Sequence, residues 1–386
     1  MEENRRPRRS AYGRNRTQQG LYLGLVLAIV IVFFSLLNLC VPDRDFSEAE
    51  NRNLAQMPKL SWQSLKDGSY FEGIDHYLAD QFVGRDFWIS LRLGYTQLMG
   101  QKESNEVLLC DDEYLMEKPA APDEAAVAKN LQAISDFAAR HGRLNICMSV
   151  VPTAACVMQD KLPANVPIRD QQADIAALKE AVSGVRFADV TEALLAQSSK
   201  QLYYRTDHHW TSQGAYFAFW DMADELNITP VGEYDIYTVS IDFEGTLASK
   251  SGSHGAEDTV KIYAPKTDID YRVTYVDTGE VSASMYCRDA LKGKDHYTVF
   301  FGGNYPRIDI ETTANTGRTL LLFKDSYANC MVQFLMPYFD KIVMIDPRYY
   351  YDSADALVAS EGVTDVLFLY NVNTFHGDTS LYGVLR

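Results

Sequence analysis

The sequence lacks closely spaced cysteine pairs. Its six cysteines lie far apart, and none belongs to a Cys-x-x-Cys motif: Cys40, Cys110, Cys147, Cys156, Cys287 and Cys330. Because such pairs supply most cysteine zinc sites, a zinc ion held by cysteines is not expected. Cys147 lies in an apolar run and Cys330 in a predicted helix, and we interpret both as buried free thiols. Disulfides are the alternative if the domain lies outside the cytoplasm.

Basic residues are scarce beyond the amino terminus. The 386-residue chain has a formal net charge of −16, although its first 20 residues contain six arginines and only two glutamates. The rest is therefore more acidic than the whole, and we expect this charge to lie on a solvated surface. Contacts with nucleic-acid phosphates need clustered lysine and arginine, so nucleic-acid binding is not expected. We find no internal repeat.

A long apolar run, residues 21–40, follows the basic segment. Twenty helical residues at about 1.5 Å each are enough to span a bilayer. A cleaved signal peptide is the alternative, but its apolar core is usually only roughly 7–15 residues long, and no A-x-A motif follows here. A lipoprotein signal ending at Cys40 fits poorly because Leu39 is not small. We therefore predict a cytoplasmic basic tail at 1–20, an uncleaved single-pass anchor at 21–40, and an extracytoplasmic remainder.

Residues 41–105 are predicted to form a tether and a helical region. The stretch 69–99 is rich in aromatic side chains, among them Phe71, Phe87 and Trp88. Aromatic residues at helical spacing are usually core residues, so we favour core packing over a ligand-binding groove.

Residues 106–386 alternate strand and helix patterns, which indicates an α/β domain with parallel strands and right-handed crossovers. The predicted strands are 144–151, 185–189, 319–323, 341–345 and 365–370, and the predicted helices are 123–141, 173–182, 191–198, 213–227, 327–339 and 354–361. Residues 230–313 contain short strand-like runs and many turn residues. We interpret them as a β-rich insertion placed over the α/β core.

One segment places a carboxylate and two imidazoles in consecutive positions. Asp207, His208 and His209 precede a helix whose start is marked by two capping candidates, Thr211 and Ser212. In an extended chain residues i and i+2 point to the same side, so Asp207 and His209 should share a face while His208 points away. A carboxylate beside an imidazole fixes its tautomer and stabilises the imidazolium, as a general base requires.

A serine far downstream is the candidate nucleophile. The predicted strand 319–323 is followed by the sequence KDS, which ends at Ser326, and then by a helix. Ser326 is therefore expected at the amino end of a helix, where free N–H groups and the helix dipole favour developing negative charge. The same position is the carboxyl end of the predicted strand, and ligands of open α/β sheets bind at the carboxyl ends of the strands. We predict a catalytic triad of Ser326 as nucleophile, His209 as base and Asp207 as its orienting carboxylate.

These motifs together resemble the DHHW family, which is related to the alginate O-acetylation proteins AlgJ and AlgX and their SGNH-hydrolase-like domain. The resemblance rests on TDHHW at 206–210 and KDSY at 324–327, with further landmarks at 47–54, Pro58, 82–86 and 150–153. It covers roughly residues 45–386. In ordinary SGNH enzymes the serine comes first, whereas here Asp-x-His comes first, as in the permuted alginate-type members.

The resemblance implies a membrane-anchored, extracytoplasmic O-acetyltransferase with an SGNH-hydrolase-like, flavodoxin-like three-layer fold and no cofactor. It would acetylate polysaccharide hydroxyls through an acyl-Ser326 intermediate, and a membrane-bound O-acyltransferase would supply the acyl donor. A carbohydrate acetylesterase of the same fold would share the acyl-enzyme and is an alternative. A non-catalytic scaffold of an envelope polysaccharide complex is another, although an intact triad argues against it.

Further residues are candidates for the oxyanion and acceptor sites. The nucleophile's own N–H would donate one hydrogen bond to the oxyanion. Asn371 or Asn373, after a predicted strand, or Asn304, after a glycine pair, would supply the second donor. Tyr327 and Trp210 are candidates for the acceptor site, with structural packing as the alternative for both.

The three consecutive residues Asp207, His208 and His209 also resemble the metal-binding Asp-His-His of DHH phosphoesterases. That family carries further aspartate motifs for which this chain offers no convincing partner, and it acts in the cytosol. We therefore expect no metal at this site.

Overall fold

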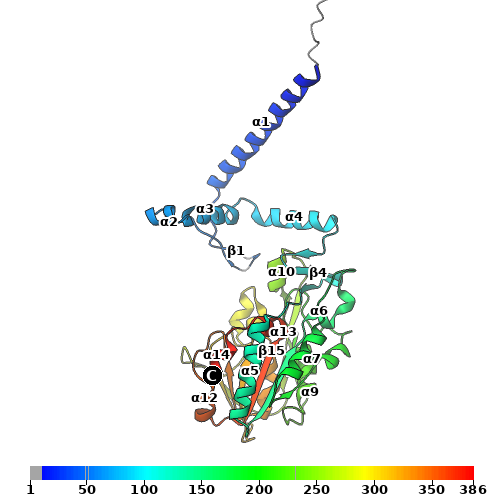
Figure 1. The fold of residues 1–386 in the computed structure, drawn as a ribbon, viewed down its shortest axis with the longest axis vertical. Helices are drawn as coiled ribbons and strands as arrows, with labels where there is room; N and C mark the ends of the chain where they lie inside the picture. Colours follow the sequence, from blue (N-terminus) through cyan, green and yellow to red (C-terminus); the bar gives the residue numbers. More distant parts are fainter. Residues whose placement is uncertain (1–10, 48, 51, 231) are drawn as a thin grey trace, which may run out of the picture. The chain divides into compact units, whose positions relative to one another are not determined.

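The computed structural model describes residues 11–47, 49–50, 52–230 and 232–386, and Figure 1 shows the course of the chain. The chain divides into two compact units, the first ending at Gly94 and the second running from Tyr95 to Arg386. The first ten residues of the predicted cytoplasmic tail lie outside the described residues.

The first unit begins with a long apolar helix, α1 (Ala11–Cys40). Its part from Gln19 to Cys40 is long and apolar enough to cross a membrane, and its side chains are not buried against the rest of the protein. A membrane span and a signal sequence both have these properties.

Three shorter helices and a small hairpin follow α1, and the last of these helices runs past Gly94 into the second unit. Their bounds are β1 (Phe46–Ser47), β2 (Arg52–Asn53), α2 (Trp62–Lys66), α3 (Ser69–Asp80) and α4 (Arg85–Leu98). The Asp80 carboxylate accepts hydrogen bonds from Arg52 Nη1 at 2.8 Å and Nη2 at 2.6 Å, and these bonds lower the pKa of Asp80 to about 2. Arg85 Nη1 contacts Glu50 at 2.5 Å. These ion pairs tie the hairpin segment to the turn between α3 and α4.

The prediction that the aromatic side chains of 69–99 form a core is wrong for most of them. The exposed ones are Phe71, Phe82, Phe87, Trp88 and Tyr95. Burying an amphipathic helix requires a second layer, and the short helices of this unit do not cover one another in that way.

The second unit is built on an eight-stranded mixed sheet, in the order β11-β10-β12-β14-β13-β15-β6-β7. The parallel strands are β14 (Lys341–Ile345), β13 (Thr319–Lys324), β15 (Asp365–Asn371), β6 (Asn145–Val151) and β7 (Arg186–Phe187). Because they are parallel, their carboxyl ends meet at one edge of the sheet.

Helices cover both faces of this sheet (Figure 1). One core contains Leu321 and Phe323 with α5 (Glu124–Arg140), α7 (Gln171–Ala181), α12 (Ala354–Glu361), α13 (Val372–Gly377) and α14 (Leu381–Val384). The other contains Leu320 and Leu322 with α6 (Ala154–Val157), α8 (Thr191–Leu195), α9 (Ser212–Met222) and α11 (Ala328–Leu335). This alternation along β13 explains its unbroken apolar run, and the predicted three-layer α/β arrangement is confirmed.

The region 230–313 is rich in strands, but only part of it lies outside the main sheet. Strands β10 (Tyr271–Tyr275), β11 (Glu280–Ser282) and β12 (Arg307–Thr312) extend the sheet, with β12 antiparallel to β14. Strands β8 (Tyr234–Phe243) and β9 (Asp258–Pro265) form a separate antiparallel pair, and α10 (Thr246–Ser251) lies in the connection between them. A third small sheet contains β3 (Glu103–Ser104), β4 (Val107–Leu109) and β5 (Leu115–Glu117).

Candidate active site

Ser326 lies in the turn between β13 and α11, where the sequence pattern places it. The preceding Asp325 shapes this turn, because its carboxylate accepts from the Tyr327 N–H at 2.9 Å and from the Asn371 N–H at 2.7 Å. The turn is thereby tied to the end of the neighbouring strand β15. Ser326 is half-buried, and its Oγ lies 2.7 Å from His209 Nε2.

Residues 207–209 lie at the tip of a tight loop and not in an extended segment. Tyr203 and Trp210 form an antiparallel bridge, and the Tyr204 N–H donates to the His209 carbonyl at 3.2 Å. The chain therefore reverses direction within these residues, and the alternation expected of an extended chain does not apply.

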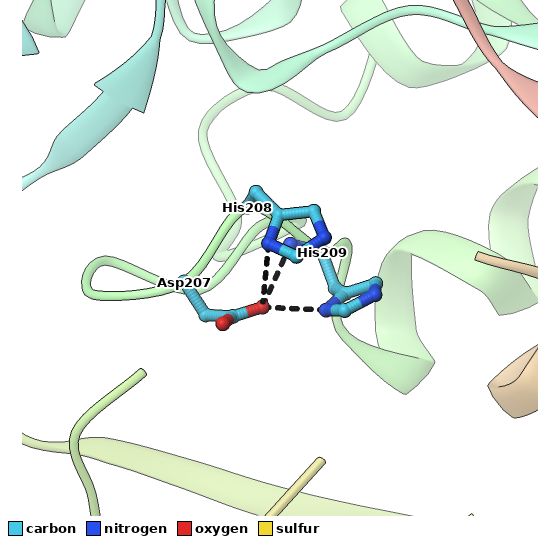
Figure 2. A group of neighbouring side chains, drawn as sticks. All are labelled: Asp207, His208 and His209. Atoms are coloured by element: carbon cyan, nitrogen blue, oxygen red, sulfur yellow. Dashed lines mark hydrogen bonds and ion pairs between the residues drawn. The ribbon is translucent and has the colours of Figure 1, made fainter. Parts of the chain in front are cut away.

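His208 consequently lies beside its neighbours, contrary to the expectation that it points away (Figure 2). Its ring centroid is 3.9 Å from that of His209, and its Nδ1 is 2.9 Å from Thr246 Oγ1. Its carbonyl accepts a hydrogen bond from the Tyr327 hydroxyl. His208 is therefore part of the same cluster, although it does not contact the serine through any hydrogen bond among the described residues.

The Asp207 carboxylate is fully buried and fully engaged. Its Oδ1 accepts from the His209 N–H at 2.9 Å and lies 2.6 Å from His209 Nδ1 (Figure 2). Its Oδ2 accepts from the N–H and the hydroxyl of Thr246, at 2.9 and 2.8 Å. Burial opposes ionisation, but the charges of His208 and His209 and these hydrogen bonds hold the pKa of Asp207 well below its usual range.

Residues of the β-rich region 230–313 pack against this loop and accept its hydrogen bonds. A Cβ atom on Gly245 would lie 2.3 Å from Asp207 Cβ, so only glycine fits at this position. The Asp258 carboxylate accepts from the Arg205 N–H at 3.0 Å, from the Thr206 N–H at 2.8 Å and from the Thr206 hydroxyl at 2.8 Å. Residues far away in sequence thus fix the backbone that carries Asp207.

His209 has the protonation state that a general base needs. Because the ionised Asp207 can only accept hydrogen bonds, His209 Nδ1 carries a proton, which leaves Nε2 to accept the proton of Ser326 Oγ. Burial, reinforced by the charge of His208, lowers the pKa of His209 to about 4, against the opposing effect of Asp207. His209 is therefore neutral at neutral pH.

Tyr297 is a further site residue that the sequence motifs did not reveal. Its ring stacks on His209 with centroids 3.7 Å apart and an angle of 11°, and its hydroxyl donates to the Ser326 carbonyl at 2.8 Å. It lies in a short 3₁₀ helix, His296–Val299, whose spacing from either motif carries no recognisable signal. Tyr297 therefore contacts both His209 and Ser326.

Trp210 and Tyr327, predicted as acceptor-site candidates, are both buried core residues. The indole Nε1 of Trp210 donates to the Tyr327 carbonyl at 2.9 Å. A buried ring offers no face on which a sugar could stack, so the packing alternative is correct for these two residues. They join the 207–209 loop to the start of α11.

Asn304 and Asn371, the candidate oxyanion donors, have different surroundings. Asn304 is exposed, and its Oδ1 accepts from Lys324 Nζ at 2.9 Å. Asn371 is buried, its Oδ1 accepts from the Asn373 N–H at 2.9 Å, and its Nδ2 has no hydrogen-bond partner among the described residues. A buried amide with free N–H groups is unusual. The backbone N–H of Asn371 also donates to Asp325, the residue that precedes Ser326.

The group Asp207, His208 and His209 has potential metal ligands within 4.8 Å of one another. However, both Asp207 oxygens accept hydrogen bonds, and both ring nitrogens of His209 are engaged with Asp207 and Ser326. A metal ion would have to displace these contacts, so the geometry favours the hydrogen-bonded chain over a metal centre.

Two family models match the sequence. Residues 107–263 match the SGNH hydrolase-like domain of acetyltransferase AlgX, and residues 50–113 match the DHHW protein model. The resemblance to these families is therefore confirmed, and the AlgX match contains the 207–209 loop but ends before Ser326. No curated protein matches the sequence closely.

Solved structures of similar fold agree with these matches. A DHHW family protein from Eubacterium siraeum is 25% identical, with a TM-score of 0.63, and the similarity covers 72% of this chain and 95% of that one. PatB1 from Bacillus cereus, in a structure with a sulfonyl adduct, is 19% identical, with a TM-score of 0.61 and coverage of 72% and 98%. The second unit thus has the fold of these proteins.

Proposed function

We propose that the second unit is a serine-dependent O-acyltransferase that transfers acetyl groups to polysaccharide hydroxyls. The continuous contact from Ser326 Oγ to His209 Nε2 at 2.7 Å, and from His209 Nδ1 to Asp207 at 2.6 Å, carries this proposal. The match of residues 107–263 to the SGNH hydrolase-like domain of acetyltransferase AlgX supports the acyl class of reaction.

In the first half-reaction Ser326 Oγ bonds to the acyl carbon of the donor while its proton moves to His209 Nε2. The leaving oxygen of the donor takes this proton as its bond to the acyl carbon breaks, which leaves acyl-Ser326. In the second half, a sugar hydroxyl gives its proton to His209 Nε2 and attacks the acyl carbon. Ser326 Oγ then leaves and regains the proton. Asp207 stabilises the imidazolium in both halves.

The oxyanion of each tetrahedral intermediate needs at least two hydrogen-bond donors. The Ser326 N–H, close to the first turn of α11, is one proposed donor. The Asn371 side chain is the other, because its Nδ2 is buried without a partner among the described residues and its backbone is bound to Asp325. Asn304 is less suitable, since its exposed side chain already binds Lys324.

We further propose that α1 is an uncleaved anchor and that the second unit faces away from the cytoplasm. The arginine-rich residues before α1 favour a cytoplasmic amino terminus. A polysaccharide is then the acceptor, and a membrane-bound O-acyltransferase is the partner that delivers the acyl group across the membrane.

An esterase of the same mechanism differs only in the second half-reaction, in which water replaces the sugar hydroxyl.

To test the proposal, purified protein is incubated with 4-nitrophenyl acetate, and the acetylated residue is identified by peptide mass mapping. We expect acetyl-Ser326, and acetylated saccharide when an oligosaccharide acceptor is added. Free acetate alone would favour the esterase, and the absence of any acetyl-enzyme would favour the scaffold.

A further inference from the structure

The helices of the first unit expose several large apolar side chains on their surfaces. These are Trp62, Phe71, Leu78, Phe87, Trp88 and Leu91. Neighbouring exposed apolar side chains of this size mark an interaction surface and not an ordinary protein surface.

The exposed apolar residues follow helical periodicity. Phe71 and Leu78 lie two turns apart on α3, and Phe87 and Leu91 lie one turn apart on α4. Each pair therefore shares one side of its helix, and we call these four residues the apolar sides of α3 and α4. Polar residues such as Arg92 occupy other parts of the helix surface, so both helices are amphipathic.

Contacts with α1 fix the depth of this segment. The Phe82 ring stacks on Phe34 at 5.6 Å, the Trp88 ring lies 5.9 Å from Phe34, and the Val83 N–H donates to Asn38 Oδ1 at 2.7 Å. Phe34 lies inside the apolar stretch of α1, about 9 Å before its carboxyl end at about 1.5 Å per residue. Residues that touch Phe34 must therefore lie where a membrane-spanning α1 leaves the bilayer.

We infer that α3 and α4 lie in the boundary between lipid headgroups and acyl chains, with their apolar sides inserted into the membrane. The inference rests on the proposal that α1 spans the membrane. Amphipathic helices with tryptophan and phenylalanine bind at this depth, and tryptophan is enriched there. The ion pairs of Arg52 and Arg85 with Asp80 and Glu50 tie the hairpin segment to the turn between these helices.

The test uses the full-length protein in phosphatidylcholine vesicles that contain no other protein. Lipid brominated on the acyl chains near the glycerol quenches the fluorescence of tryptophans that it contacts. Trp88→Phe should remove most of the quenching, because Trp88 is the tryptophan that α3 and α4 contribute. Trp220→Phe is the matched control: Trp220 in α9 is 42% exposed and Trp88 40%, yet the control should leave the quenching unchanged.

A second variant tests the apolar sides directly. Phe87→Asp combined with Leu91→Asp should reduce the quenching to the level of Trp88→Phe, whereas Ile236→Asp combined with Ile241→Asp, on exposed positions of β8, should not. Vesicle flotation is measured on the same samples. Protein that does not float would refute the anchor and the inference together. Floating protein whose quenching is unaffected by Trp88→Phe would overturn the inference alone.

Discussion

The candidate site joins two regions that are built in different ways. Ser326 lies in a turn between a central strand and a helix, so elements adjacent in sequence position it. The 207–209 loop has no helix or strand of its own at its tip, and Gly245, Thr246 and Asp258 of the β-rich region hold it. Tyr297 contacts both regions.

Substitutions in the two regions should therefore reduce activity in different ways, by removing the reacting group in one and by displacing it in the other. A change at Ser326 should remove the reaction while leaving the strand and helix intact, because the side chain is half-buried and its hydroxyl bonds only to His209 among the described residues. A change at Gly245, Thr246 or Asp258, which hold the 207–209 loop, should instead displace Asp207 and His209 together. Activity should therefore be lost through geometry, with the nucleophile still present.

The largest expected effect is that of Ser326→Ala. Removing the nucleophile should lower kcat for acyl transfer by about 10⁴-fold or more, since members of a triad act as a unit. The free energy of unfolding should change by at most about 1–2 kcal/mol, the range for a residue near a helix start. Both are measured on the same preparation, by acetyl transfer and by denaturant unfolding. Retained transfer activity would refute the serine mechanism.

Asp207→Asn should have the next largest effect, and it changes the 207–209 loop instead of the Ser326 turn. The amide cannot hold His209 Nδ1–H in the required tautomer, so kcat should fall by about 10³–10⁴-fold. Asp207 also accepts hydrogen bonds from Thr246 and from the His209 N–H, so an amide group placed there should destabilise the fold by about 1–3 kcal/mol. A variant with full activity and unchanged stability would contradict the assigned role of Asp207.

The serine region is the part that sequence reasoning describes best. The apolar run 319–323 is buried on both faces as a parallel strand, and such strands read as continuous apolar segments. A strand followed by a turn and a helix places Ser326 at the sheet edge without further information. The predicted helix 354–361 has the same bounds in the structure, and α5 differs from its prediction by one residue at each end.

The loop region could not be derived in the same way. The spacing of Asp207 and His209 predicted their contact through an extended segment, whereas this contact and the direction of His208 arise in a chain reversal closed by Tyr203 and Trp210. The glycine at 245 and the tyrosine at 297 matter only through three-dimensional contacts. In the first unit, aromatic periodicity predicted helices correctly but not burial, since a periodic apolar side can face lipid as well as a protein core.

Gly245→Ala should break the loop region specifically. The added Cβ would lie 2.3 Å from Asp207 Cβ, so the loop must move, and a displacement of about 1 Å can lower kcat by about 10²-fold. Gly293→Ala is the control, because a Cβ there meets its nearest atom at 3.5 Å and φ is −91°, which alanine adopts freely. Transfer rates and unfolding curves of the two variants are compared. Equal activity in both would show that Gly245 does not position Asp207.

Tyr297→Phe tests the link between the two regions. The ring that stacks on His209 is kept, while the hydroxyl loses its hydrogen bond to the Ser326 carbonyl at 2.8 Å and a longer one to the Tyr327 carbonyl at 3.5 Å. One such bond contributes about 1 kcal/mol, so we expect a decrease of up to about tenfold in kcat. Tyr286→Phe, which removes a hydroxyl bound to Gln333 in the same unit, should leave kcat unchanged. An effect confined to KM would place Tyr297 in acceptor binding instead.

The smallest effect is expected for His208→Gln, and it concerns the pH profile. His209 must be neutral to act as a base, and its pKa of about 4, below the ordinary 6.5, keeps it neutral from weakly acidic pH upward. We therefore expect kcat/KM of the native protein to fall only as pH drops through about 4.

The charge of His208 opposes a proton on His209, and the variant glutamine removes this charge while it can still bind the Thr246 hydroxyl. The acid limb of kcat/KM should then move to higher pH, toward 6.5, with little change at pH 7–8. A shift to lower pH would show that His208 does not act through its charge. A loss of activity at every pH as large as that of His209→Ala would show instead that His208 is the base.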